Sequence, residues 1–190
     1  MSSVHAPSAQ RYGWVAVVLH WLLALLIVGT FSMGLYMHDL PFSIQRVKFF
    51  NWHKWAGITI LSLSVLRLLW RCTHRPPPLS ALVLSHMPDW QRSVHRASLW
   101  AMYALFFIVP LLGWAYSSAD GMHVMWFGVL PFPDLVAPDR ELAETVLKPM
   151  HKTSAFVLGA LVLLHTAAAL KHHFIDRDGL IGRMWPSRLG

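Results

Sequence analysis

Two histidines near the end of the chain, His151 and His165, have the spacing expected of ligands to two stacked cofactors. They lie 14 positions apart in the stretch PMHKTSAFVLGALVLLHTAAALKHH, which is mostly apolar and ends in a basic, histidine-rich cluster. In a helix, 14 residues turn through about 1400°, about 40° short of four full turns, so both rings leave nearly the same face. They would be about 21 Å apart along the axis. Two haems stacked across a membrane need such a helix.

Lysines mark the depth of a first pair of rings. His53 is followed by Lys54 just as His151 is followed by Lys152. Each of these histidines therefore lies near the start of an apolar stretch, at the same end of the molecule. We predict that His53 and His151 form one pair of ligands, the outer pair.

The second pair is identified in the same way at the opposite end. His20 lies nine residues after Arg11, and His165 lies six residues before Lys171, which places both rings inside the other leaflet. We predict that His20 and His165 form the inner pair. Two imidazoles on one haem iron leave no position open for oxygen, an arrangement suited to electron transfer.

The composition indicates a membrane protein of one domain, residues 1–190. The 190-residue chain is 55% hydrophobic and only 13% charged, and several stretches approach the length that crosses a bilayer. We predict an all-α, integral membrane four-helix bundle. The expected spans are residues 14–37, 50–70, 92–116 and 150–173, with longer connections at 71–91 and 120–148.

The basic residues favour cytoplasmic N- and C-termini. With that orientation the six outer basic residues are balanced by six acidic ones, so the whole net charge of +7 lies on the inner side and does not require nucleic acid as a partner. The ten basic residues of the inner side are Arg11, Arg67, Arg71, Arg75, Arg92, Arg96, Lys171, Arg177, Arg183 and Arg188. The six of the outer side are Arg46, Lys48, Lys54, Arg140, Lys148 and Lys152.

Further residues on the helix faces would support the cofactors. Arg67 is 14 positions after His53 and faces the same side, so it could pair with the propionates of an inner haem; Arg71 is the lesser candidate. Arg67 could equally well extend its charged end to the lipid headgroups. Gly57 and Gly159 would let a flat macrocycle approach the backbone, although glycine is also common at helix contacts in membranes.

The same four histidines could instead be packing residues or the lining of a metal path. A single histidine within a membrane is more often a packed, hydrogen-bonded residue than a ligand, whereas four that pair by depth do not fit that role easily. A histidine-lined metal path would need acidic residues at membrane depth, and the expected spans contain none. The single cysteine, Cys72, excludes an internal disulfide and any cysteine-based zinc or iron–sulfur site.

The remaining histidines are expected near the surfaces. His95, beside Arg96, is too shallow for the inner pair and would be interfacial or near a quinone. His172 and His173 follow His165 by about two turns and would also be interfacial. The other five fall in the tail or the loops: His5, His38, His74, His86 and His123.

The motifs resemble those of the bacterial cytochrome b561 family of four-helix, two-haem membrane proteins. The resemblance extends from LHW at His20 through HKWAG at His53 and VLRLLWR at Arg67 to the final MHKTSAF and LLHTAAALKHH. It is strongest to the superoxide oxidase type, which takes electrons from superoxide at the periplasmic face of the inner membrane and reduces ubiquinone at the cytoplasmic side.

This resemblance implies two haem b groups, ligated by the four paired histidines, and a quinone site near the inner haem. His95, His172 and His173 are the candidate quinone contacts. Superoxide would be attracted by a basic rim beside the outer pair, provided that the acidic loop 120–148 leaves that rim positive. The rim residues are Arg46, Lys48, Lys54, Lys148 and Lys152.

A second hypothesis uses the same haem ligands. The protein would then be a non-catalytic electron carrier, or a membrane anchor, between quinol and a periplasmic redox partner. Its docking surface would be the 120–148 loop with the aromatic residues Trp126, Phe127 and Phe132.

Overall fold

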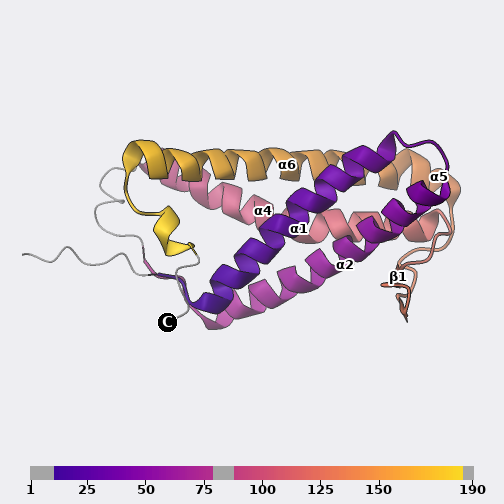
Figure 1. The fold of residues 1–190 in the computed structure, drawn as a ribbon, viewed down its shortest axis with the longest axis horizontal. Coiled ribbons are helices and arrows are strands. Elements are labelled where there is room, and N and C mark those ends of the chain that lie inside the picture. Colours follow the sequence, from indigo (N-terminus) through magenta and orange to yellow (C-terminus); the bar gives the residue numbers. More distant parts are fainter. Residues whose placement is uncertain (1–10, 79–87, 186–190) are drawn as a thin grey trace, which may run out of the picture.

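Four long helices run along one axis of the molecule (Figure 1). A computed structural model of the chain describes residues 11–78 and 88–185. Each of the four is long and apolar enough to cross a membrane, which confirms the predicted all-α membrane bundle. Three residues assigned from the sequence, Arg188, His5 and His86, lie outside the described residues. The helices are α1 (Trp14–His38), α2 (Ile44–Thr73), α4 (Asp89–Ala119) and α6 (Lys148–Lys171).

The second helix starts earlier than the hydrophobicity pattern predicts. Residues 44–49, expected in a connection, form the first turns of α2. Ser43 caps this helix, because its hydroxyl accepts a hydrogen bond of 3.2 Å from the backbone N–H of Arg46. His53 therefore lies in the third turn of α2 and not at its start. The charged side chains of Arg46 and Lys48 interrupt the apolar pattern, so the pattern does not indicate that the helix begins before residue 50.

The connection between α4 and α6 is more ordered than expected. It contains a short antiparallel hairpin, β1 (Met125–Trp126) and β2 (Leu130–Pro131), followed by α5 (Arg140–Leu142). A π-helical turn, η1 (Ala143–Leu147), leads directly into α6. Asp139 starts this helical run, because its carboxylate accepts a hydrogen bond of 3.0 Å from the N–H of Leu142. The end of the predicted 120–148 loop is thus helical.

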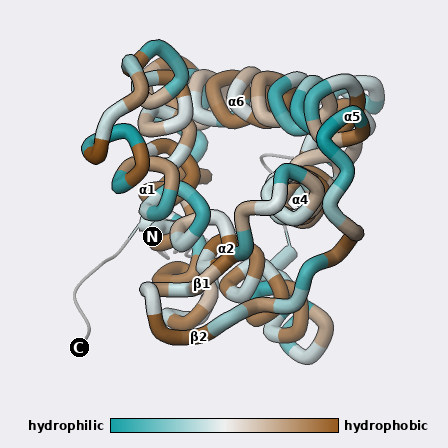
Figure 2. Tube along the Cα trace, turned by 90° about the vertical axis from the view of Figure 1, so that its right-hand side faces the viewer, coloured by the Kyte–Doolittle hydropathy of each residue, from teal (hydrophilic) through white to brown (hydrophobic). Residues whose placement is uncertain are grey.

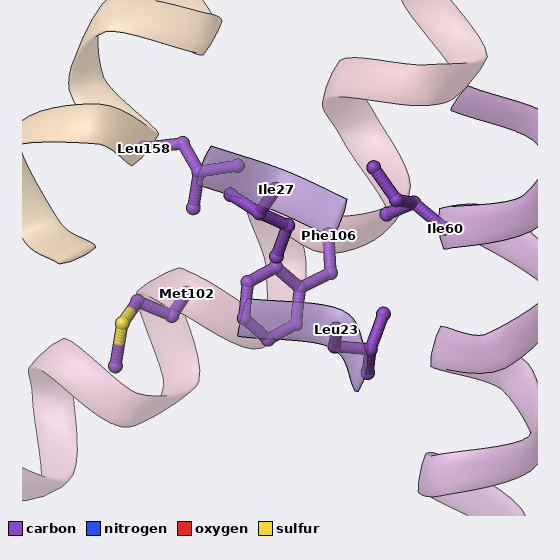
Figure 3. Packing of buried hydrophobic residues seen from close by; sticks show 6 residues of the cluster. All are labelled: Leu23, Ile27, Ile60, Met102, Phe106 and Leu158. Carbon is purple, nitrogen blue, oxygen red and sulfur yellow. The ribbon is translucent and has the colours of Figure 1, made fainter. Parts of the chain in front are cut away.

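The buried apolar side chains of the bundle pack together between the helices (Figure 3). Leu158 is seven residues from both His151 and His165 on α6, so the core separates the two predicted tiers of histidines. All four helices contribute to this apolar layer, which consists of Leu23, Ile27, Ile60, Met102, Phe106 and Leu158.

The outer surface of the bundle is apolar as well. Leu25, Leu163 and Trp100 are each about 70% exposed, at 69%, 71% and 71%. Brown, hydrophobic stretches accordingly follow the helices in Figure 2. A surface of this kind is stable in lipid and not in water.

The two described ends of the chain meet at the inner end of the bundle. The backbone N–H of Tyr12 donates to the carbonyl of Arg183 at 3.2 Å, and the indole of Trp21 donates to the carbonyl of Met184 at 2.8 Å. The buried guanidinium of Arg183 donates to the carbonyls of Pro77 and Pro78 at 2.5 and 3.0 Å. The helical turn η3 (Ile181–Arg183) therefore fastens the C-terminal segment to α1 and to the chain that follows α2.

Replacing Arg183 with Gln should release this C-terminal segment. Gln can keep one of the two hydrogen bonds, and losing the other, at about 1.5 kcal/mol, should make local opening about tenfold more frequent. Limited proteolysis, with the intact chain followed by mass spectrometry, measures this opening. Arg177→Gln is the matched control, because Arg177 is exposed and the charge change is the same. Equal cleavage rates in the two variants would show that Arg183 does not hold the segment.

Candidate functional site

The rings of the predicted outer pair face one another across the bundle. His53 on α2 and His151 on α6 have ring centroids 6.1 Å apart and planes 87° apart. Metal–imidazole bonds are about 2 Å long and a centroid lies about 1 Å behind its nitrogen, so opposite ligands of one metal ion have centroids about 6 Å apart. The spacing of this pair therefore fits a shared metal ion.

The backbone of neighbouring helices fixes both outer rings. Nδ1 of His151 lies 3.0 Å from the carbonyl oxygen of Val109 on α4, a bond that makes Nδ1 the donor and leaves Nε2 for a metal. Nδ1 of His53 is buried without a hydrogen bond of full geometry, and its hydrogen-bonding neighbour is the backbone of Thr30 on α1. Each ring thus has one nitrogen directed at another helix.

Two glycines make room for these rings. A Cβ on Gly113 of α4 would lie 2.9 Å from Cε1 of His151, closer than such atoms approach. A Cβ on Gly34 of α1 would lie 3.2 Å from Cε1 of His53. The helices therefore approach the outer pair closely because these two positions carry no side chain.

A mostly apolar cavity adjoins the outer pair. It holds about 630 Å³ of empty space, part of it open to the surroundings, and is lined by both rings, by Gly57 and Gly113, and by Met122 and Val124 of the segment after α4. Apolar walls with a few polar groups are typical of cofactor sites. A Cβ on Gly57 would meet no atom within 4 Å, so open space lies directly against the backbone, as a planar macrocycle requires.

The inner pair is also brought together. His20 on α1 and His165 on α6 have ring centroids 6.4 Å apart and planes 71° apart, again a spacing that fits one shared metal ion. The guanidinium of Arg67 lies within electrostatic reach of both rings. Gly159, in contrast, is a packing residue, since a Cβ there would lie 3.1 Å from the ring of Phe31.

Polar groups of α2 and α4 gather beside the inner pair. Arg67 and Arg71 both lie over the ring of Tyr103, with guanidinium carbons 5.7 and 5.5 Å from its centroid, and Nε of Arg67 donates to the Tyr103 hydroxyl at 3.3 Å. Ser64, one turn before Arg67, is 1% exposed, and its hydroxyl has no hydrogen-bond partner among the described residues. These groups can donate hydrogen bonds to the carboxylates of a cofactor bound at the inner pair.

The three candidate quinone contacts have different environments. His172 is largely buried, with Nδ1 2.6 Å from Asp178 and 3.1 Å from Asp176. His95 is within electrostatic reach of both His165 and His172, which brings it closer to the inner pair than its neighbour Arg96 suggested. His173 is exposed and contacts the ring of Phe174, so it does not join this group.

The predicted basic rim is only partly positive. Lys148 pairs with Glu144 at 2.6 Å. The carboxylate of Asp120 attracts the ammonium of Lys54 and offsets part of its charge. Lys54 lines the cavity and donates to the carbonyl of Met122 at 3.3 Å. Arg46 lies over the ring of Phe50, another cavity residue, whereas Lys48 and Lys152 are exposed.

Three of the remaining histidines have local partners. His38 pairs with Asp39, His123 pairs with Asp134, and His74 stacks on Trp70.

Several contributors to the site were not identified from the sequence. The contacts of Gly34, Gly113 and the Val109 carbonyl with the rings depend on how their helices are rotated. In the sequence, Ser64 and Tyr103 look like ordinary helix residues. Pro110, which follows Val109, was the one available signal, because a proline bends the local helix. The carbonyl that Pro110 frees is that of Phe106, one turn earlier, and not that of Val109.

Replacing Gly113 with Ala should weaken cofactor binding at the outer pair. The new methyl group would overlap His151, and overpacking of this kind costs about 1–3 kcal/mol. The haem-to-protein ratio and the reduced visible spectrum of the purified protein measure the loss. Gly34→Ala should have a smaller effect because its contact is longer, and Gly29→Ala none because its Cβ would meet no atom within 4 Å. Equal ratios in all three variants would show that the outer rings do not depend on these glycines.

Comparison with known proteins shows the family of this chain. The chain matches the family described as prokaryotic cytochrome b561 over residues 11–187. It is 33% identical to cytochrome b561 homolog 2 of Escherichia coli (strain K12), covering 97% of this chain and 95% of that protein. It is 30% identical to the probable superoxide oxidase CybB of Yersinia pestis (95% and 99%) and 28% identical to cytochrome b561 homolog 1 of Escherichia coli (94% and 99%). The chain therefore belongs to the prokaryotic cytochrome b561 family, whose members are haem b membrane proteins.

Proposed function

We propose that this protein is a superoxide:ubiquinone oxidoreductase of the bacterial inner membrane that binds two haem b groups. His53 and His151 hold the outer haem, and His20 and His165 hold the inner one. The observation that carries the two haem sites is the pair of ring spacings, 6.1 and 6.4 Å, each of which fits one metal ion. When bound, the haems supply reversible one-electron transfer. The N- and C-termini face the cytoplasm.

The overall reaction balances two electrons. Two superoxide anions lose one electron each and become oxygen. One ubiquinone accepts the two electrons together with two protons and becomes ubiquinol. The outer end therefore handles an anion and no protons, whereas the inner end must supply protons.

Residues of the outer end suit a small anion. The ammonium of Lys54 lies at the cavity wall beside His53, and Arg46 lies next to the cavity residue Phe50. Such charges raise the local concentration of an anion and speed its association. The 30% identity to a probable superoxide oxidase over 95% of this chain supports superoxide as that anion.

Residues of the inner end suit proton delivery to a quinone. His172 lies between the carboxylates of Asp176 and Asp178. His95 interacts electrostatically both with His172 and with His165. Histidine is the side chain best suited to exchange protons near neutral pH. Asp178 fixes the orientation of His172, and Arg67 and Arg71 provide positive charge near the electron acceptor.

The rival function is a quinone-linked electron-transfer subunit or membrane anchor for a periplasmic redox partner. Cofactor ligation would be identical, so the ring geometry does not separate the two functions. Direct reduction by superoxide does separate them, since a carrier depends on its protein partner.

The purified protein should be reduced rapidly by enzymatically generated superoxide and should then reduce ubiquinone. His165→Ala should lose about one haem of the two, keep reduction by superoxide, and lose quinone reduction, because only the inner pair is broken. His38→Ala is the control, since that exposed residue pairs with Asp39 and belongs to neither pair of rings. Haem content, stopped-flow absorbance and quinol formation are the measurements. A wild-type protein that superoxide does not reduce would exclude the proposed activity and favour the carrier.

Lys54→Gln should slow reduction by superoxide and flatten its dependence on ionic strength. One removed charge near the site should lower the rate about two- to fivefold at low salt, since electrostatic steering is screened by salt. Stopped-flow rates over a range of salt concentrations test this effect. Arg75→Gln, two residues beyond the opposite end of α2, removes the same charge and should leave the rate unchanged. An unaltered rate in Lys54→Gln would show that Lys54 does not attract superoxide.

A further inference from the structure

The hairpin between α4 and α5 contains an uncharged stretch that the proposed function does not use. Residues 124–133, Val-Met-Trp-Phe-Gly-Val-Leu-Pro-Phe-Pro, carry no ionisable side chain. At its base, His123 and Asp134 pair at 2.8 Å. A pair of polar side chains thus closes an apolar loop, as expected where a chain leaves and re-enters a polar layer.

Hydrogen bonds attach this hairpin to the side of α2. The indole of Trp55 donates to the carbonyl of Met125 at 2.5 Å, and the indole of Trp126 donates to the hydroxyl of Thr59 at 3.2 Å. Lys54 is the last charged residue of α2 before Arg67, so Thr59 is five residues, or about 7.5 Å, inside the apolar part of the helix. The hairpin therefore lies at the depth of the outer membrane interface and below it.

The hairpin lies beside the bundle and not beyond its end. In Figure 1 it hangs sideways from the end of the bundle that bears α5, and it does not extend the bundle along its axis. Figure 2 shows it beside α2 at the edge of the molecule, with a brown, hydrophobic turn. A docking loop for a water-soluble partner would instead project beyond the helix ends.

The backbone of the hairpin is suited to an apolar environment. The N–H groups of Gly128, Val129 and Phe132 donate to the carbonyls of Met125, Trp126 and Val124 at 2.9–3.1 Å. Phe127 adopts a positive φ of 51°, a strained conformation for a bulky residue, and its ring contacts Trp55 and Trp126. Irregular backbone is tolerated at membrane depth only when its polar groups are paired in this way.

The side chains that face away from the protein are all apolar. Val129 is 81% exposed, Phe127 57%, and Leu130 49%. They continue the apolar surface of the helices and are flanked by the indoles of Trp55 and Trp126, residues that concentrate at membrane interfaces.

We infer that the hairpin of residues 124–133 is a membrane anchor that inserts Phe127, Val129 and Leu130 among the lipid acyl chains of the outer leaflet. Met122 and Val124, at the start of this segment, line the cavity beside the outer pair. Lipid therefore holds one wall of the cavity in place. The position of the hairpin does not depend on which substrate the enzyme uses.

A single spin label at Val129 tests this position in the haem-loaded protein reconstituted in lipid nanodiscs. Cys72→Ser removes the native thiol, and Val129→Cys carries the label. Leu163→Cys, on the exposed face of α6, is the reference position for a label in lipid. Ala137→Cys, in the connection between α4 and α6, is the reference position for a label in water. Collision with oxygen, which concentrates in lipid, is compared with collision with a water-soluble nickel chelate.

The label at Val129 should behave as the label at Leu163 does, with oxygen more effective than the nickel chelate, and Ala137 should show the reverse. The thiol of Val129→Cys should also react with a charged maleimide about tenfold more slowly than that of Ala137→Cys, because an apolar environment resists thiolate formation. Nickel accessibility at Val129 equal to that at Ala137 would overturn the inference. Accessibility in nanodiscs with protection in native membranes would also overturn it and would assign the hairpin to a protein partner.

Discussion

The central constraint in this protein is that polar imidazole rings at membrane depth need polar partners, which neighbouring helices must bring to them. An unpaired polar group in an apolar environment costs several kcal/mol, as a buried amide or hydroxyl shows. Nδ1 of His151 pairs with the carbonyl of Val109. The ring of His53 faces that of His151 at a distance that fits one metal ion between them. Helix packing follows from this arrangement, because α1 and α4 approach the rings at Gly34 and Gly113, where a methyl group would collide.

A single helix sets the distance between the two tiers. His151 and His165 both belong to α6, which is continuous from Lys148 to Lys171, so their separation of about 21 Å is fixed by helical rise and not by packing. The apolar layer around Leu158 fills the space between them with side chains from all four helices. This apolar layer separates the polar groups of one tier from those of the other.

The pairs of histidines could be predicted because charged residues mark depth and only a few histidines lie within apolar stretches. Helix ends were less predictable: Ser43 starts α2 before the apolar stretch begins, and the π-helical turn after Asp139 gives no hydrophobic signal. The glycine contacts depend on how α1 and α4 rotate about their axes, which the sequence of either helix alone does not specify. The hairpin could not be distinguished from a loop, because its uncharged stretch of residues 124–133 is too short to span a membrane and has no helical periodicity.

The titratable groups are distributed as the proposed direction of electron flow requires. Oxidation of superoxide releases no proton, and the outer rings face an apolar cavity whose other titratable side chains are Lys54, which would attract the anion, and Tyr116. Reduction of a quinone consumes two protons, and the inner end carries His95 and the couple of His172 with Asp178. The reverse direction would place the proton-consuming step beside this cavity, whose lining has no carboxylate and no histidine other than the outer pair. The asymmetry between the two ends therefore favours electron entry at the outer pair, independently of the relatives.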